Sequence, residues 1–320
     1  MNAEATLSLP TIDVENSHRA LTIYLDHLAP SGRRSMRSLL QRVGECCDWH
    51  GPLEHWPWLS LRYADLMSMR SALQAEQLSA NSINTCLAAV RGILKVGFQL
   101  GVFPHDAWLH VQSVANVSVS RSAKGRQLTA REVQRLMTAC RHDPNPRVAL
   151  RDEAILTVLL YAGLRRAELV QLQISDFDTR LGDLHIRCGK GQKSRNLPLP
   201  IAAKQVLKIW LKKRGTLPGP MFVQIDQSQS IGKVGGFNQP FSALTPHQVY
   251  ALLRRRCSQA GIAQCSPHDL RRTFVSRLLE LGVDLNTARQ LAGHEHIQTT
   301  SLYDRRGEKQ QRQAMAQFRL

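Results

Sequence analysis

The sequence predicts a mainly helical protein of two domains: an all-α N-terminal domain, followed by a mixed α/β domain with a small antiparallel sheet. Three observations support this fold class. The chain has 320 residues, more than one domain usually holds. Apolar residues recur at helical spacing from about residue 17 to residue 114, where nothing alternates like a strand. A short alternating stretch occurs only in the second half, around a turn rich in glycine and lysine.

The first domain is predicted over residues 17–114, after an N-terminal tail of residues 1–16. Its clearest helix begins near Ser79 and ends before Gly101, a residue type that favours helix termination. The apolar residues of this helix are spaced by three and four positions, and they are Ile83, Leu87, Val90, Ile93, Leu94 and Phe98. This spacing gives the helix one face for a hydrophobic core.

A linker is predicted over residues 115–127, which are small, polar and basic and have no apolar period. The segment could be a solvated loop, or its positive charge could place it along a phosphate backbone. Thr129 and Glu132 then form the pattern of a capping box, so a helix begins directly after the linker. The second domain is therefore predicted over residues 128–320.

The second domain is expected to contain one β-hairpin among helices. An apolar helix is predicted at 147–161. The hairpin follows, with alternation from Leu184 to Cys188, a turn at 189–194 and a return strand at 196–199. Two further helices are predicted at 201–214 and 247–260.

The charge of the chain points to a polyanionic partner. It has 42 Lys+Arg against 25 Asp+Glu, a formal net charge of +17 and a pI near 10.2. Nucleic acid fits this charge better than a membrane does, because the longest apolar run, 154–164, is shorter than the roughly 18 residues that span a bilayer. The N-terminus lacks the features of a signal peptide, and none of the seven cysteines forms a Cys-x-x-Cys pair. We expect a cytoplasmic, nucleoid-associated bacterial protein with reduced thiols.

Two short segments carry arginines suited to an anion. Gly163 ends a helix, and Arg165 and Glu168 follow on one face of the next, where the acid can hold the guanidinium in place; an ordinary surface ion pair is the alternative. Ser266 and a following proline start another helix, which places His268 and Arg271 one turn apart at its positive end. That end suits a phosphate, although a hydrogen-bonded histidine and a solvated arginine would look the same.

Two further residues could take part in phosphoryl transfer. Lys190 occupies the glycine-flanked tip of the hairpin, from which its ammonium could reach a leaving oxygen, although most turn lysines are simply solvated. Tyr303 follows the pair Gly293 and His294 and could be a nucleophile toward phosphorus. A ring packed in the core is the alternative for this tyrosine.

In this order the segments read Arg, Lys, His-x-x-Arg, Gly-His and Tyr, and they resemble the tyrosine recombinase (phage integrase) family over nearly the whole chain. The nine positions from His294 to Tyr303 also fit the pattern of the family. One departure is Arg272, where many members carry a second histidine. The resemblance implies the catalytic residues Arg165, Lys190, His268, Arg271, His294 and Tyr303, with Glu168 in support.

The resemblance also implies the fold, the reaction and the partners. The N-terminal domain would be an all-α core-binding (SAM-like) domain, and the second an α/β catalytic domain of the tyrosine recombinase type. The enzyme would cut and rejoin double-stranded DNA at a specific site through a 3′-phosphotyrosyl intermediate, in integration, excision or resolution. No cofactor is required, because the intermediate conserves the phosphodiester energy. The working assembly would be a tetramer holding two DNA sites, with accessory proteins in some systems.

The lengths of two segments refine this resemblance. About 16 residues precede the first helix, too few for a separate arm-binding domain, and this favours a simple architecture similar to the Xer recombinases. The 78 positions from Lys190 to His268 argue against the additional helical insertion of integron integrases. Two rivals stay open: a type IB topoisomerase and a DNA-binding regulator without catalytic activity.

Other polar residues give weaker indications. His294 and His296 lack the nearby carboxylates that a metal site would need, so we expect no metal. Three basic clusters could contact phosphates or be solvated, and they are Arg33–Arg34, Lys212–Arg214 and Arg254–Arg256.

Overall fold

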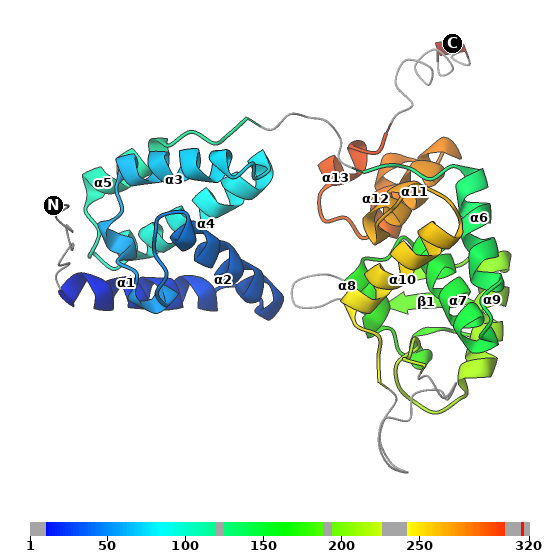
Figure 1. Ribbon diagram of the computed structural model, residues 1–320. Coiled ribbons are helices and arrows are strands. Elements are labelled where there is room, and N and C mark those ends of the chain that lie inside the picture. The colour runs from blue at the N-terminus through cyan, green and yellow to red at the C-terminus, as the bar shows by residue number, and fades with distance from the viewer. Residues whose placement is uncertain (1–10, 119–124, 188–193, 226–241, 305–314, 317–320) are drawn as a thin grey trace. The chain divides into compact units, whose positions relative to one another are not determined.

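The computed structural model describes residues 11–118, 125–187, 194–225, 242–304 and 315–316. The chain divides into two compact units, residues 1–122 and 123–320 (Figure 1). The boundary between them falls within the segment 115–127 that the sequence analysis assigned to a linker. Each unit is described by itself below.

The described part of the first unit is helical. Its longer helices are α1 (Thr11–Asp26), α2 (Pro30–Glu45), α3 (Tyr63–Ala75), α4 (Ala80–Gln99) and α5 (His105–Ser113). Two short 3-10 helices, η1 (Leu53–His55) and η2 (Trp58–Ser60), lie between α2 and α3.

Helix α4 is the centre of the first unit, because it packs against α1, α2, α3, α5 and η2. Its first residue follows Ser79, whose Oγ accepts a hydrogen bond from the Ser82 amide at 3.2 Å. Five of the six apolar residues predicted to face the core are buried, and only Phe98 is partly exposed. The predicted start and core face of this helix are thus confirmed.

The second unit contains eight helices, one short 3-10 helix and two strands among its described residues. The helices that precede the hairpin are α6 (Ala130–Arg141), α7 (Pro146–Ala162), α8 (Arg166–Gln171) and η3 (Ile174–Asp176). Those that follow it are α9 (Ile201–Arg214), α10 (Pro246–Gln259), α11 (Pro267–Glu280), α12 (Leu285–Ala292) and α13 (Ile297–Ser301). The predicted helices at 147–161, 201–214 and 247–260 are confirmed to within one residue at each end.

Helix α7 passes through the core of the second unit and packs against α6, α8, α9 and α11. Most of its residues are buried, from Ala149 to Ala162, so it has no solvated face like that of an ordinary amphipathic helix. Helices α11, α12 and α13, coloured orange to red in Figure 1, gather at one end of this unit. They enclose a separate small apolar cluster that includes Phe274, Val275 and the ring of Tyr303.

The sheet is one antiparallel hairpin of β1 (Asp183–Ile186) and β2 (Arg195–Pro198). Asp183 pairs with Pro198 and Ile186 with Arg195, so the two strands are in register along their length. The turn, including Cys188 and Lys190, lies outside the described residues. The prediction of a mainly helical fold with a small antiparallel sheet is confirmed.

Two observations bear on the expected location of the protein and on the expected state of its cysteines. No described helix combines the length and the apolar character needed to cross a membrane. The six described cysteines are all free thiols; Cys86, Cys140, Cys257 and Cys265 are buried, and the other two are not.

Two of the basic clusters contain arginines that are structural, which corrects the expectation of phosphate contact or solvation. Arg214 is 3% exposed and donates to the Pro220 carbonyl from Nη2 at 2.9 Å. Arg256 is fully buried and pairs with Asp152, on α7, and with Asp143. These guanidiniums are desolvated and paired within the unit, so they are not available to DNA.

Asp152→Ala is expected to lower the free energy of unfolding by about 3–5 kcal/mol, because it removes the buried carboxylate that Arg151 and Arg256 share. The carboxylate is fully buried and accepts from Arg256 Nε at 2.9 Å, Arg255 Nη2 at 3.0 Å and Arg151 Nη2 at 2.8 Å. Guanidinium chloride unfolding of the full chain measures the change.

The matched control is Asp26→Ala, which removes an exposed ion pair with Arg33. This change should cost less than about 1 kcal/mol. A loss for Asp152→Ala that is no larger than the loss for Asp26→Ala would contradict a structural role of the buried network.

Candidate active site

Helix α11 positions the first two candidate residues. Its N-cap Ser266 donates from Oγ to the Asp269 carboxylate at 2.7 Å and accepts from the Asp269 amide at 3.3 Å, which confirms the predicted helix start. His268 and Arg271 follow one turn apart and border a cavity of about 320 Å³. The residues that line it are Leu164, Arg165, Arg166, Tyr250, Ser266, Pro267, His268 and Arg271.

Arg165 reaches this cavity from the start of α8, where Glu168 holds it. The Glu168 carboxylate accepts from Arg165 Nη1 at 2.8 Å and from the Arg165 amide at 2.9 Å. Burial alone would raise the pKa of Glu168, but the ion pairs with Arg195 and Arg165 lower it. The Glu168 side chain is only 9% exposed, so the pair is not an ordinary surface ion pair.

Arg271 is almost completely buried, with an exposed fraction of 3%. Its Nη1 donates to the Gly163 carbonyl at 2.7 Å, and its buried Nη2 has no hydrogen-bond partner among the described residues. Burial, followed by the nearby charge of Arg165, lowers the pKa of Arg271 to about 10. The guanidinium therefore stays charged near neutral pH, and Nη2 is a donor suited to an anionic oxygen.

Each of these arginines is also held by a main-chain carbonyl of a glycine that ends a helix. Gly163 follows α7 with φ 58°, and its carbonyl accepts from Arg271. Gly293 follows α12 with φ 68°, and its carbonyl accepts from Arg165 Nη2 at 3.0 Å. A Cβ atom would lie 2.2 Å from Phe274 at Gly163 and 2.4 Å from Arg195 Nη1 at Gly293. Because φ is also positive at both positions, a larger residue would be strained at either one.

His268 contacts the candidate nucleophile. Its Nε2 lies 3.2 Å from the hydroxyl of Tyr303, although the two residues are 35 positions apart in the chain. Desolvation of its ring and the charges of Arg272 and Arg271 lower the pKa of His268. A neutral imidazole is thus favoured, and a neutral imidazole can accept the phenolic proton.

His294 lies against the same tyrosine. Its ring stacks on the Tyr303 ring at 5.8 Å between centroids, and its Nδ1 lies 2.9 Å from the Thr300 hydroxyl. Burial and the charges of Arg271 and Arg165 lower the pKa of His294 to about 3, so this ring is neutral. When Thr300 donates to Nδ1, the Nε2 nitrogen carries the proton and can donate to a phosphate oxygen.

Tyr303 itself is 5% exposed and is part of the apolar cluster of α11 and α12. The ring is thus packed, as one alternative expected, while its hydroxyl lies beside His268; the role of nucleophile stays a prediction. The structure brings six of the seven predicted residues into one neighbourhood, and these are Arg165, Glu168, His268, Arg271, His294 and Tyr303. Lys190 lies outside the described residues.

Sequence reasoning missed Arg195, the first residue of β2. Its Nη2 donates to Glu168 at 3.0 Å and its Nη1 lies 3.4 Å from the other carboxylate oxygen, so one acid holds two arginines. Its positive charge also lowers the pKa of Arg271 and of His294. The only sequence signal was the position of Arg195 at the end of the predicted turn that carries Lys190.

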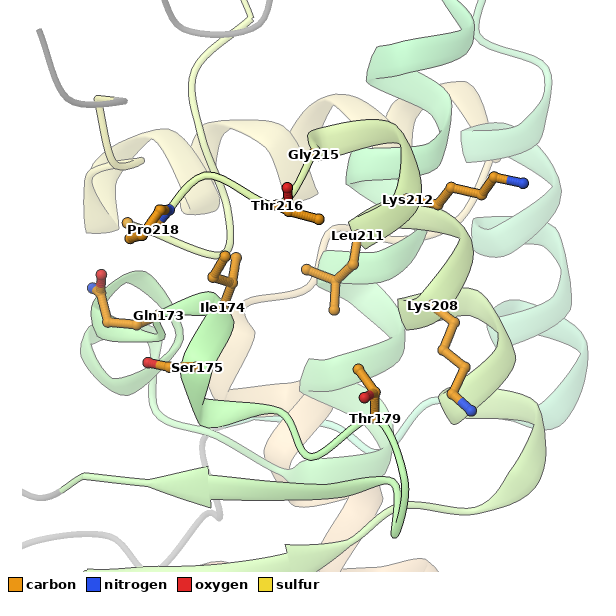
Figure 2. Close-up of a pocket in the computed structure, with 11 residues that line it drawn as sticks. Gln173, Ile174, Ser175, Thr179, Lys208, Leu211, Lys212, Gly215, Thr216 and Pro218 are labelled. Atoms are coloured by element: carbon orange, nitrogen blue, oxygen red, sulfur yellow. The ribbon is translucent and has the colours of Figure 1, made fainter. Parts of the chain in front are cut away.

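We also searched for a metal site and for a second pocket. The described residues contain no group of three His, Cys, Asp or Glu side chains that could hold a metal ion. A pocket of about 810 Å³ lies between η3 and the end of α9 and shares no lining residue with the cavity beside Arg165. Figure 2 shows Ile174 and Leu211 facing this pocket, whereas the amino groups of Lys208 and Lys212 point away from it. Its lining contains no Asp, Glu, His, Cys or Tyr side chain.

The cluster can do one kind of chemistry well. A phenol hydroxyl beside a neutral imidazole can attack phosphorus, and the buried Nη2 of Arg271 can stabilise the charge that grows on the non-bridging oxygens. In a helical unit with one small hairpin, these features fit a tyrosine-type site-specific DNA recombinase.

The chain belongs to the phage integrase family, whose sequence pattern matches residues 126–310. The tyrosine recombinase XerC of Azotobacter vinelandii is 30% identical over 295 residues, which cover 88% of this chain and 90% of that protein. XerC of Alcanivorax borkumensis is 29% identical over 294 residues, covering 91% and 90%. The Tn1549 transposon integrase, solved in complex with transposon right end DNA, has the same fold, with a TM-score of 0.70 at 17% identity over 94% of this chain and 99% of that chain.

Proposed function

We propose that this recombinase cuts DNA with Tyr303 and that the six other predicted residues assist that step. The observation that carries the proposal is the 3.2 Å contact between the Tyr303 hydroxyl and His268. Beside it, the buried Nη2 of Arg271 has no hydrogen-bond partner among the described residues. Attack on a phosphodiester needs three groups: a nucleophile, a base that accepts its proton, and a hydrogen-bond donor for the anionic phosphate oxygens.

In the proposed step, Tyr303 Oη forms a bond to the scissile phosphorus and the phosphorus–O5′ bond breaks. The phenolic proton passes to His268 Nε2, and Lys190 supplies the proton that the leaving 5′-oxygen takes up. Arg165 and Arg271 hold the non-bridging oxygens, His294 donates to the same phosphate, and Glu168 keeps Arg165 in position. The product is a 3′-phosphotyrosyl DNA with a free 5′-hydroxyl.

Rejoining is the reverse of this step. A 5′-hydroxyl from another strand attacks the phosphotyrosyl bond, Tyr303 leaves as a phenol, and no energy source is consumed because one phosphodiester replaces another. The reaction therefore requires no cofactor. Strand exchange between two sites needs four such tyrosines, and for this reason we propose a tetramer of this chain on paired DNA sites.

We further propose how the chain divides this work. Residues 17–114 would form the core-binding domain, residues 115–127 the linker and residues 128–320 the catalytic domain, after a tail of residues 1–16. The net charge of +17 and the DNA-bound state of the Tn1549 integrase support double-stranded DNA as the partner of both domains. An enzyme acting on bacterial DNA would work at the nucleoid in the cytoplasm.

Covalent trapping tests the proposal. The wild-type protein is incubated with sheared genomic DNA and denatured, and the DNA that stays attached is sequenced to identify the cleaved site. We expect one class of site, a free 5′-hydroxyl at the break, and an adducted peptide that contains Tyr303. Absence of an adduct would point instead to a regulator, and supercoil relaxation without site dependence to a topoisomerase.

A further inference from the structure

Arg272 follows Arg271 on α11, but its side chain meets a different group. Its guanidinium carbon lies 5.1 Å from the centroid of the Tyr303 ring, within the range of a cation–π interaction. The side chain is buried, with an exposed fraction of 8%, and the tyrosine is 5% exposed. Cation–π contacts are stronger when both groups are desolvated, as they are here.

The guanidinium of Arg272 is enclosed on another side by the main chain at Gly125. A Cβ atom added at Gly125 would lie 3.3 Å from Arg272 Nε and Nη2, and 2.7 Å from the Asp269 carboxylate. That carboxylate also accepts from the Arg126 amide at 2.8 Å, which fixes this part of the chain against α11. Arg272 is therefore held between a tethered main-chain segment and the ring of the tyrosine.

The charge of Arg272 lowers the pKa of both Asp269 and His268. Burial alone would raise the pKa of Asp269, but hydrogen bonds from Ser266 and Arg126 and the charge of Arg272 lower it, so it is an anion beside Arg272. The pKa of His268 is lowered by desolvation first and then by Arg272. Besides Tyr303, the charged groups that act on His268 are Arg272, Arg271 and Asp269 on α11 and Arg165 before α8.

We propose that Arg272 is a positioning residue for the nucleophile: its guanidinium holds the Tyr303 ring so that the hydroxyl stays beside His268. The proposal rests on the proposed function, in which Tyr303 Oη attacks phosphorus, its proton passes to His268 Nε2 and the phosphorus–O5′ bond breaks. Arg272 touches none of the reacting atoms. It acts through the face of the ring and through its charge on the imidazole.

The charge of Arg272 predicts a signature in the pH profile. Because this charge disfavours a protonated imidazole, removing it raises the pKa of His268. A base must be neutral to accept a proton, so attack by Tyr303 would then require a higher pH. The acidic limb of the rate profile should move upward.

The test compares Arg272→Met, Arg272→Gln and Arg272→Lys in the full chain, each at saturating concentration of a nicked duplex that carries the cleaved site. The measured quantity is the single-turnover rate of adduct formation between pH 5 and 9. We expect the two neutral variants to be slower by about 3–30-fold, the span of a cation–π interaction, with the acidic limb displaced upward. Arg272→Lys keeps the positive charge and should recover most of the rate. Arg277→Met, which changes a partly exposed arginine of α11, is the matched control.

A second substrate separates attack from leaving-group protonation. In DNA with a sulfur at the bridging 5′ position the thiolate leaves without a proton, so the defect of a variant that lacks a general acid is relieved. The defect of Arg272→Met should persist on this DNA, because it lies in the attack by Tyr303. Relief of the defect would overturn the proposal.

The remaining outcomes are also decisive. A rate and pH profile of Arg272→Gln equal to those of the wild type would show that Arg272 does not position Tyr303. An equal loss in Arg272→Lys and in the neutral variants, with the acidic limb unmoved, would make the residue a packing element only. If thermal unfolding shows that Arg272→Met does not fold, the rate and pH profile of Arg272→Gln decide whether Arg272 positions Tyr303. Failure of the wild type to form any adduct would contradict the proposed function instead.

Discussion

Tyr303→Phe is expected to eliminate the covalent protein–DNA adduct, with a loss of at least about 10⁴-fold in the rate of adduct formation. The change removes the one oxygen that would bond to phosphorus and leaves the aromatic ring. That ring lies in the apolar cluster of α11 and α12 and stacks on His294, so its packing survives the substitution. His268 loses a hydrogen-bond partner at 3.2 Å, but its ring is only partly desolvated and can bond to water instead.

Adduct formation is measured on the nicked duplex by denaturing gel electrophoresis, and DNA binding by a shift assay on the same duplex. Binding should change by less than about twofold, because the substitution removes one hydroxyl and no positive charge. The matched control is Tyr161→Phe on α7, whose side chain is 41% exposed and lies outside the cluster. A persistent adduct in Tyr303→Phe would assign the nucleophile to another residue.

Arg271→Lys should slow adduct formation by about 10²–10³-fold at saturating DNA. Arg271 can donate to the Gly163 carbonyl from Nη1 and to a phosphate oxygen from Nη2 at the same time. An ammonium is a compact charge without this planar fork, so it cannot reproduce both bonds in the same geometry. Because charge grows on the non-bridging oxygens during attack, the loss should fall on the rate and less on the affinity.

The control for this prediction is Arg277→Lys, a partly exposed arginine farther along α11. Its rate should match the wild-type rate. If Arg271→Lys binds DNA more weakly but reacts at the wild-type rate once DNA is saturating, Arg271 contributes to binding and not to the transition state. A melting temperature close to that of the wild type would show that the variant is folded.

Local patterns predicted local structure well. Thr129 and Glu132 form the capping box expected from their spacing, with the Thr129 amide 2.9 Å from the carboxylate. Ser266 caps α11, and the alternation around Leu184 became one strand of a hairpin. These features depend on side chains three or four positions apart, or on a period of two, and a sequence displays both directly.

Contacts between distant segments could not be predicted in the same way. Arg195 and Glu168 are 27 positions apart, and Arg272 and Tyr303 are 31 apart, so neither contact leaves a local pattern. Arg256 was assigned to a surface basic cluster because its neighbours are arginines, yet the fold buries it against Asp152. Local features supplied most candidate residues and the family pattern joined them into one site, but their catalytic roles stay predictions.

The two glycine carbonyls that hold Arg165 and Arg271 have a consequence for engineering the specificity of this enzyme. Because main-chain carbonyls hold both guanidiniums and Glu168 also holds Arg165, side chains that contact neither arginine can be randomised without removing these hydrogen bonds. Gly163 and Gly293 must be left out of such libraries, since any added Cβ atom would meet Phe274 or Arg195. Selection for a new DNA site can therefore proceed around a proposed active site whose two arginines keep their main-chain hydrogen bonds.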